Sequence, residues 1–409
     1  MKPQAIIFIG SNTTSSGITF LQKAHELGFI PILLHRAKDP IQQFANVHSA
    51  VFYQADIDQR EQVDVAIQQI ELDYHIAGIT TSSDYSIVMV AEQAVSRGLP
   101  APNPESVRQC RDKIRQREIL HDAKVSQPAY KAVHNAHEAM KAYDDLNDGN
   151  GVIIKPADGT GSVGVYRVNS PVEMQTVATE LFQNVFNTRG QRRETTACLV
   201  EEFIRGNEVS VEVFHGHIVG ITQKHVTDPP RFLETGHDFP ANSLSKQEQT
   251  AIETTAVAAL KALGLTFGPL HIELRYRDGV AYIIEVNARL AGGSLPTLFE
   301  ECGHDMIQKT LAAIVGIAVP KSIPSKKYAS IRYFRATASG VLGGLTGTEE
   351  YINDPDVSLT SYSNEGESVV GNTGDFRERI GHVIVTGENP DEVIRKITTI
   401  HSQIQVIIR

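Results

Sequence analysis

Cysteine is scarce in this sequence and scattered along it. Only Cys110, Cys198 and Cys302 occur among the 409 residues, and no two of them are close together. An odd number of widely spaced cysteines fits neither a framework of disulfide bonds nor a zinc site. We therefore expect the protein to work in a reducing compartment, the cytoplasm.

Basic clusters and long hydrophobic runs are missing as well. The 38 Lys and Arg residues against 48 Asp and Glu residues give a net charge of −10, with no dense basic stretch. This balance argues against nucleic acid or an anionic membrane as the main partner. The apolar run at 5–10 (AIIFIG) is too short for a signal sequence or a membrane span, and it predicts a first β-strand instead.

The length of the chain exceeds what one ordinary hydrophobic core supports, so we predict several domains of α/β and α+β type. Proline clusters suggest boundaries that give an N-terminal domain at 1–105, a central domain at 106–320 and a C-terminal α+β domain at 321–409. The prolines are Pro100, Pro102, Pro104, Pro320 and Pro324.

Residues 4–105 alternate apolar strand patterns with amphipathic helix patterns, which is typical of a parallel α/β layer. Their first loop, GSNTTSSG at 10–17, lacks the G-x-G-x-x-G spacing of a dinucleotide site. We interpret this loop as a turn into a helix, or as a site for part of a small substrate.

Residues 268–296 predict a β-hairpin whose turn is either two residues (Asp278-Gly279) or three residues long. The shorter turn would send the side chains of Glu273 and Glu285 to opposite faces. The longer turn, with its glycine in the left-handed conformation, separates apolar from polar residues almost completely. We therefore predict the longer turn, which places Glu285 opposite His271 and diagonal to Glu273. The predicted apolar face carries Leu270, Ile272, Leu274, Tyr276, Tyr282, Ile284, Val286 and Ala288, with Ala281 and Ile283 near the edge of the polar face.

Two carboxylates and an amide, from Glu273, Glu285 and Asn287, would share that polar face. Hard oxygen ligands of this kind suit Mg²⁺, which is usually shared with phosphates. Arg289 follows with a fork suited to an anion, and Gly292-Gly293 offers backbone N–H groups. The alternative is the solvated outer face of an antiparallel sheet, which binds nothing.

A glycine-rich loop, PADGTGSVGV, follows a strand pattern that ends at Lys155. Backbone and hydroxyl groups around Gly161, Ser162 and Gly164 are suited to surrounding phosphates. The loop is not a Walker A motif, because the lysine precedes the glycines and no G-K-[ST] follows. A flexible turn is the alternative.

A later strand pattern ends at Glu201 and is suited to a purine base. The backbone after it, at Phe203 and Ile204, would be free to hydrogen-bond the edge of the base, and Glu208 would take ribose hydroxyls. An ordinary hairpin is the alternative for this segment. For Lys113, the alternative to a role in a site is a position on a solvated helix surface.

Taken in this order, the motifs resemble the ATP-grasp superfamily of carboxylate–amine ligases over nearly the whole chain. The E-V-N-A-R segment with an upstream glutamate is the specific part of the match. Within the superfamily the chain looks most like the L-amino acid ligases, which make dipeptides. The shared segments are G-H-D-F-P-A, R-L-A-G-G-S-L-P and G-H-V-I-V-T-G.

The resemblance implies an ATP-grasp architecture, in which a lid subdomain at about 125–200 and an antiparallel sheet enclose the nucleotide. Mg²⁺ would be bound, typically as two ions, with Mn²⁺ as an alternative. The resemblance also assigns roles: ATP binding to Lys113, Lys155, Gly161, Ser162, Gly164, Glu201, Phe203, Ile204 and Glu208, metal binding to Glu273, Glu285 and Asn287, catalysis to Arg289 and His237, and substrate binding to Arg289, Gly292 and Gly293.

The expected reaction activates a carboxylate, that of an L-amino acid, as an acyl phosphate and joins it to an amine, giving a dipeptide or amide, ADP and phosphate. Three alternatives stay open: a ligase for another carboxylate or amine in purine or natural-product biosynthesis, a nucleotide-binding regulator without turnover, and a nicotinamide oxidoreductase. A homodimer is the oligomeric state that the resemblance suggests.

Overall fold

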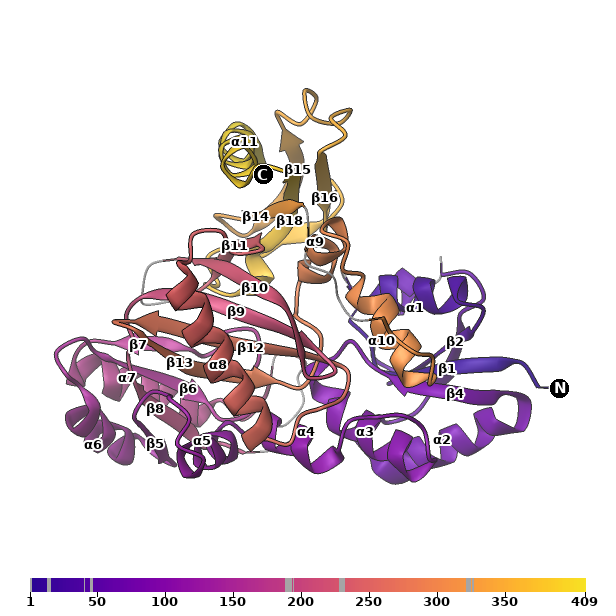
Figure 1. Ribbon diagram of the computed structural model, residues 1–409, viewed down its shortest axis with the longest axis horizontal. Coiled ribbons are helices and arrows are strands. Elements are labelled where there is room, and N and C mark those ends of the chain that lie inside the picture. The colour runs from indigo at the N-terminus through magenta and orange to yellow at the C-terminus, as the bar shows by residue number, and fades with distance from the viewer. Residues whose placement is uncertain are drawn as a thin grey trace.

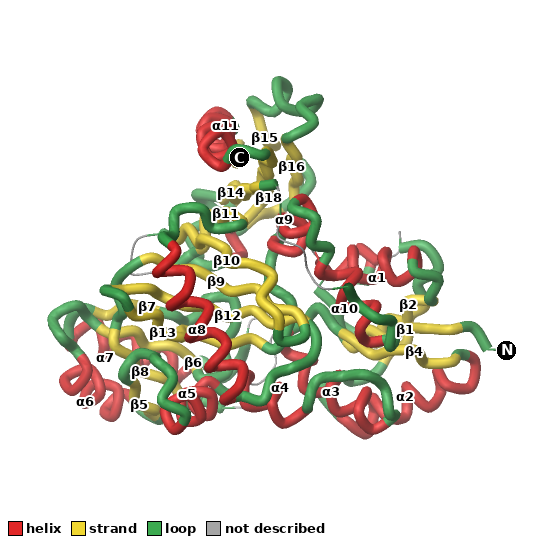
Figure 2. The backbone as a smooth tube through the Cα atoms, in the orientation of Figure 1, coloured by secondary structure: helices red, strands yellow, loops and turns green. Residues whose placement is uncertain are grey.

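The structure is a computed structural model that describes residues 2–12, 16–39, 41–44, 47–187, 193, 195–227, 232–320, 325 and 327–409. Residues 13–15 of the first loop and Pro324 of the predicted boundary lie outside the described residues. Figures 1 and 2 show an N-terminal α/β unit, a large antiparallel sheet, a smaller sheet beside it and a projecting C-terminal part. No helix among the described residues is long and apolar enough to cross a lipid bilayer.

The N-terminal unit is the predicted parallel α/β layer, with strand order β3-β2-β1-β4. Strand β1 is buried on both faces: Ala5, Ile7 and Ile9 join one core, and Ile6 and Phe8 join another. Helices α2 and α3 cover the first face, whereas α1 and the late helix α10 cover the second. The elements are β1 (Gln4–Ile9), α1 (Ser16–Glu26), β2 (Ile30–His35), β3 (Val51–Gln54), α2 (Arg60–Asp73), β4 (His75–Thr80), α3 (Ile87–Ser96) and α10 (Met306–Ile314).

A large antiparallel sheet follows, with strand order β13-β12-β9-β10-β11-β14-β18-β16. Helix α8 lies across one face of it (Figure 1) and packs its apolar side on the strands, which leaves the other face to the functional site. Its central elements, with the helices around them, are α4 (Pro104–Arg111), α5 (Lys113–Asp122), β9 (Asn207–Phe214), β10 (His217–Val226), β11 (Glu234–Phe239), α8 (Lys246–Ala262), β12 (Pro269–Arg277), β13 (Val280–Asn287) and α9 (Leu295–Glu301).

A smaller antiparallel sheet, of order β5-β8-β6-β7, lies where we expected the lid subdomain. Two helices, α6 and α7, pack against each other and cover one face of it. The elements are β5 (Tyr130–Val133), α6 (Ala136–Leu146), β6 (Val152–Pro156), β7 (Tyr166–Val168), α7 (Pro171–Gln183) and β8 (Cys198–Glu202).

The C-terminal part continues the large sheet, because β14 pairs with β11 and in turn carries β18 and β16. The remaining strands β15, β17 and β19 form a small sheet of their own, and α11 packs on β14 and β18. The elements are β14 (Tyr328–Arg335), β15 (Gly340–Thr346), β16 (Val357–Ser361), β17 (Ser368–Val369), β18 (Arg379–Gly387), α11 (Pro390–Gln403) and β19 (Gln405–Ile408).

The segment that leads from the N-terminal unit to the small sheet forms two helices, α4 and α5. Asn103 caps the first of them, α4, by accepting backbone N–H bonds at 2.9 and 3.1 Å. Asp112 leaves the helical conformation, ends α4 and caps α5. The break places Lys113 at the very start of α5, where its side chain is buried rather than solvated.

The predicted three-residue turn of the hairpin is wrong. Arg277 pairs with Val280 across a two-residue Asp278-Gly279 turn, and both turn residues have positive φ angles of 51° and 87°. Such a turn matches the right-handed twist of the two strands, and Asp-Gly is one of its preferred sequences.

A β-bulge nevertheless brings the two carboxylates to one face. The register shifts between Glu273 and Leu274, so that Leu274 pairs with Ile283 while Glu273 pairs with Glu285. Ile284 is the extra residue of the bulge. It shifts by one position which side chains of β13 face the core and which face the opposite side, so the alternation before the bulge is opposite to that after it. As a result Ala281 and Ile283 join the apolar core, which corrects the predicted apolar face, whereas Ile284 faces the cavity described below.

Candidate functional site

A cavity of about 820 Å³ lies between the N-terminal unit, the large sheet, the small sheet and the C-terminal part. It is large enough for a nucleotide with additional ligands, since ordinary ligand sites range from about 300 to 1,000 Å³. All the predicted site residues line it except Gly164 and His237. The lining residues among them are Lys113, Lys155, Gly161, Ser162, Glu201, Phe203, Ile204, Glu208, Glu273, Glu285, Asn287, Arg289, Gly292 and Gly293.

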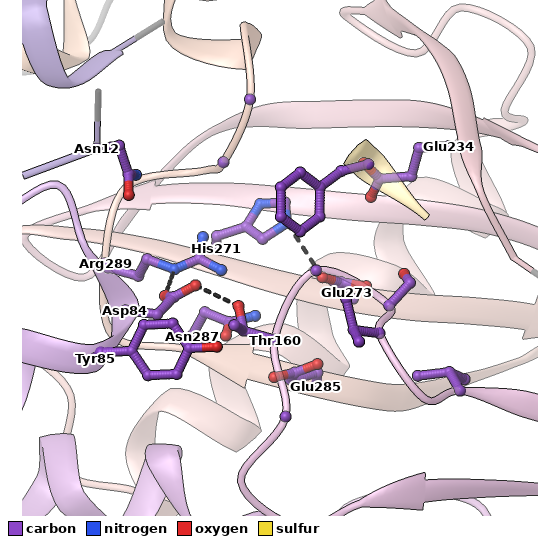
Figure 3. Close-up of a pocket in the computed structure, with 18 of the residues that line it drawn as sticks. Asn12, Asp84, Tyr85, Thr160, Glu234, His271, Glu273, Glu285, Asn287 and Arg289 are labelled. Atoms are coloured by element: carbon purple, nitrogen blue, oxygen red, sulfur yellow. Dashed lines mark hydrogen bonds and ion pairs between the residues drawn. The ribbon is translucent and has the colours of Figure 1, made fainter. Parts of the chain in front are cut away.

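The predicted metal ligands lie on the neighbouring strands β12 and β13, which form part of the cavity wall (Figure 3). Glu273 and Glu285 are direct partners across β12 and β13, and Asn287 pairs with His271. Lys113 approaches Glu285 at 2.8 Å. Two carboxylates and an amide on one face are the hard oxygen donors that Mg²⁺ requires, so the residues present fit the ion. The described residues contain no cluster of three or more His, Cys, Asp or Glu side chains arranged as a metal site.

A buried histidine positions one of these carboxylates. His271 contacts Glu212 at 3.0 Å through Nδ1 and Glu273 at 3.5 Å through Nε2. Burial alone would lower the pKa of His271, but the charge of Glu212 and the bonds to both carboxylates outweigh it and raise the pKa to about 9. His271 is therefore a cation at neutral pH and holds Glu273 in place.

Lys224 is a second buried cation that sequence reasoning missed. Its ammonium lies 2.8 Å from Glu208, 3.0 Å from Glu234 and 2.8 Å from Glu273. Burial would lower the pKa of Lys224, yet the three carboxylates raise it well above its usual value. The available signal was a lysine inside an apolar strand pattern, because such a residue is rarely buried without partners.

The proposed adenine end of the cavity is held by a buried ion-pair cluster. Glu201 accepts from Arg117 Nε and from Lys155 Nζ, both at 2.7 Å. Burial would raise the pKa of Glu201, but these two cations lower it to about 2. Both carboxylate oxygens of Glu201 are thus already engaged by protein groups. The carboxylate of Glu208 is engaged as well, because Arg275 donates two hydrogen bonds to it, at 3.1 and 2.6 Å.

The glycine-rich loop connects three parts of the molecule. Thr160 donates its hydroxyl to Asp84, which follows β4 in the N-terminal unit. A Cβ on Gly161 would approach the ring of Phe376, in the C-terminal part, to 3.0 Å. Gly164 instead lies against Pro156, with a φ of +74°, so it shapes the turn and does not face the cavity.

Asp84 also binds the predicted catalytic arginine, as Figure 3 shows. Arg289 Nε donates to one oxygen of Asp84, while Arg289 Nη1 donates to the carbonyl of Leu290 at 2.8 Å. Burial would raise the pKa of Asp84, but Arg289 and Arg111 hold it well below its usual range. The N-terminal unit therefore contributes a fixed negative charge to the site, which sequence reasoning missed.

His237 lies in strand β11, because its backbone pairs with β10 on one side and β14 on the other. Its side chain is fully buried, and burial lowers the pKa to about 3, so the imidazole is neutral. Neither ring nitrogen has a hydrogen-bond partner among the described residues. Glu234, which does line the cavity, lies 3.9 Å from Nε2.

The sequence matches two families, the ATP-grasp domain over residues 149–297 and the L-amino acid ligase C-terminal domain 2 over residues 332–409. The uncharacterized protein y4rH of Sinorhizobium fredii is 27% identical over 399 residues, which cover 96% of this chain and 81% of that protein. Carnosine synthase 1 of Gallus gallus is 23% identical over 65% of this chain, which spans only 31% of that longer protein.

Solved structures share the fold. An L-amino acid ligase from Bacillus licheniformis superposes with a TM-score of 0.81 at 21% identity, covering 100% of this chain and 99% of its own. A biotin carboxylase from Campylobacter jejuni has a TM-score of 0.72 at 18% identity, covering 100% and 92%. These structures show that the chain has the same fold. The two family matches show an ATP-grasp domain and an L-amino acid ligase C-terminal domain in this chain, which is an ADP-forming, ATP-dependent carboxylate–amine ligase similar to the L-amino acid ligases.

Proposed function

We propose that this enzyme activates the carboxylate of an L-amino acid with ATP and joins it to an amine, releasing ADP and phosphate. The observation that carries the proposal is the pair of opposite charges formed by Asp84 and Arg289 beside the carboxylates of β12 and β13. A free amino acid carries an ammonium and a carboxylate a few atoms apart, so a site for it needs one anion and one cation at that spacing.

Members of the superfamily use ATP with Mg²⁺. In this chain Glu273, Glu285 and Asn287 would hold the metal, which we propose to be two ions, and the metal would neutralise phosphate charge. Lys113, Lys155 and the loop around Gly161, Ser162 and Gly164 would bind the phosphates. Glu201, Glu208 and the backbone of Phe203 and Ile204 would bind the adenosine.

The reaction needs no nucleophilic side chain. A substrate carboxylate oxygen attacks the γ-phosphorus, the bond between the β- and γ-phosphates breaks, and ADP leaves. The amine then attacks the carbonyl carbon of the acyl phosphate, loses a proton, and expels phosphate. Arg289 and the N–H groups of Gly292-Gly293 would stabilise the negative oxygen in between, a contribution of about 3–4 kcal/mol per donor.

Water must be kept away from the acyl phosphate, and the glycine-rich loop is suited to that task. Thr160 of this loop contacts Asp84, which we propose to bind the ammonium group of the amino acid. The loop that covers the site is therefore linked to substrate binding. His237 is proposed to meet the transferred phosphate through a ring N–H. Because His237 does not line the cavity, that contact requires Glu234 to move.

The test incubates the enzyme with ATP, Mg²⁺ and single or pooled amino acids, and measures ADP, phosphate and products by mass spectrometry. We expect a dipeptide or another amide of an amino acid. Asp84→Asn should raise the KM of the amino acid without a comparable change for ATP, whereas Asp64→Asn, on an exposed surface of the same unit, should change neither. AMP with pyrophosphate, or turnover only with carboxylates that lack an amino group, would contradict the proposal.

Two further proposals concern the setting of the enzyme. The described cysteines are free and buried, which supports a cytoplasmic enzyme that forms no disulfides. We also propose a homodimer, and light scattering of the purified protein measures this directly.

A further inference from the structure

The C-terminal part forms one end of the cavity, and a second arginine dominates it. Arg379, at the start of β18, lines the cavity with 10% of its side chain exposed. Its Nη2 donates to the carbonyl of Glu234 at 2.9 Å and to the carboxylate of Glu234 at 3.0 Å, and the guanidinium lies 4.0 Å from the ring centroid of Tyr333. Tyr362, from the segment after β16, lines the same end.

Two buried polar atoms at this end have no hydrogen-bond partner among the described residues. They are Arg379 Nε and His382 Nε2. Tyr362 hydroxyl contacts Ser294 Oγ at 2.7 Å and His382 Nδ1 at 2.8 Å, so a chain of polar groups leads to the cavity wall. A buried donor without an acceptor costs about 1–3 kcal/mol, and more when it is charged. Of the residues that carry these atoms, Arg379 lines the cavity, so its guanidinium is the group that a ligand with acceptor oxygens would contact.

A glycine separates this end from the proposed amino-acid site at Arg289. Gly293 lies four residues after Arg289, and a Cβ built on it would come within 3.3 Å of Tyr333 Oη and 3.5 Å of Arg379 Nη1. Its φ of +62° also disfavours any other residue. A Cβ built on the neighbouring Gly292 would lie 4.0 Å from Arg289 Nη1, so this turn carries no side chain next to either arginine and leaves room for a ligand at each.

We propose that Arg379 binds the carboxylate of the amine substrate, so that the second substrate is recognised as an amino acid and the product is a dipeptide. This inference rests on the proposed function and deepens it. The proposed function assigns Arg289, with its partner Asp84, to the first amino acid, so a second substrate carboxylate needs a second cation. Arg379 lines the cavity, and its Nε has no hydrogen-bond partner among the described residues.

The experiment compares two nucleophiles in the presence of ATP, Mg²⁺ and the first amino acid. Hydroxylamine attacks an acyl phosphate to give a hydroxamate and phosphate, and it carries no carboxylate. An amino acid gives the dipeptide, and its amide derivative has the same amine but a neutral end. Arg379→Gln should raise the KM of the amino-acid nucleophile about tenfold or more, and it should abolish the preference for the acid over the amide. Hydroxamate formation should stay near the wild-type rate.

Arg379→Lys keeps the positive charge but loses the planar, two-donor geometry of the guanidinium. It should therefore restore only part of the preference for the acid over the amide. Arg335→Gln is the matched control, because this arginine lies on neighbouring strand β14, pairs with Glu378 and does not line the cavity. An unchanged KM for the amino-acid nucleophile in Arg379→Gln would overturn the inference. So would loss of hydroxamate formation in both Arg379 variants, since Arg379 would then serve the first step. If the wild-type enzyme makes no hydroxamate with any amino acid, the proposed function itself fails.

Discussion

Replacing Glu201 with glutamine tests the buried ion-pair cluster beneath the proposed adenine site. The change keeps the shape of the side chain but removes the charge shared by Arg117 and Lys155. Arg117 retains the carbonyl oxygens of Ile283 at 3.0 Å and Ile284 at 2.7 Å. Among the described residues, Lys155 retains the carbonyl of Ile284, at 3.5 Å, and the attraction of Glu285. The cost therefore falls mainly on Lys155, which stays buried beside Arg117 and loses the carboxylate that it contacts directly.

The magnitude follows from the pKa of Glu201, which is lowered from 4.5 to about 2. That shift corresponds to about 3 kcal/mol of stability at neutral pH, at the low end of the 3–5 kcal/mol typical of a broken buried ion pair. Because the folded-state pKa lies below the unfolded value, this stability is present above pH 4.5 and is lost as the pH falls toward 2. At pH 3 only about 1 kcal/mol should remain.

Hydrogen–deuterium exchange of the β6 and β8 amides is the appropriate assay, because it measures opening of the small sheet separately from the other domains. Glu201→Gln should lower the free energy of opening by about 3 kcal/mol at pH 7, with the difference from wild type shrinking at acid pH. Glu118→Gln, which removes an exposed ion pair with Arg115, should change it by less than about 1 kcal/mol. Equal protection in wild type and Glu201→Gln, or a difference independent of pH, would refute the reasoning.

Three further outcomes are expected. Glu285→Ala should lower kcat for ADP release by about a hundredfold or more, because it removes a proposed metal ligand and leaves Lys113 without its carboxylate; coupled ADP detection measures it. Glu212→Gln should lower the pKa of His271 from about 9, so that the cation is lost at a lower pH and the alkaline limb of the kcat/KM profile moves to lower pH. Removing divalent ions with EDTA should stop ADP formation and adding Mg²⁺ should restore it, whereas turnover in EDTA would contradict the metal assignment.

Much of the fold could be predicted because local patterns dominate it. The parallel N-terminal layer is confirmed, since buried strands such as β1 consist of unbroken apolar runs. The break at Asp112 has no clear marker in the sequence, because helix propensity on both sides is favourable and the cap becomes visible only in the backbone. Strand β11 was missed because Glu234, His237 and Asp238 are uncommon inside a sheet. Their partners Lys224, Arg379 and Arg332 come from other strands.

The residues that line the cavity show which members of a site can be predicted from the sequence. Those within recognisable motifs, such as Glu285 and Asn287, were named in advance, and their assigned roles remain predictions. Asp84, Lys224 and Arg379 stand far apart in sequence, within no motif, and each is a common charged residue. Only the pairing of β11 with β14, and the return of the chain to the N-terminal sheet at α10, bring their surroundings together. Charges contributed by separate domains cannot be located by spacing along one chain.

The hairpin shows how two correct local rules can conflict. Asp278-Gly279 is an excellent two-residue turn, while the polar pattern requires one more residue between the carboxylates than a regular two-residue hairpin provides. A regular ladder from this turn would direct Glu285 into the core beside Ile283, and burying an unpaired carboxylate there would cost several kcal/mol. The bulge at Ile284 satisfies both rules, because the turn keeps its geometry and Glu285 returns to the face of Glu273. Disagreement between turn type and polar alternation is therefore itself a sequence signal for a bulge, and bulges are common next to active sites.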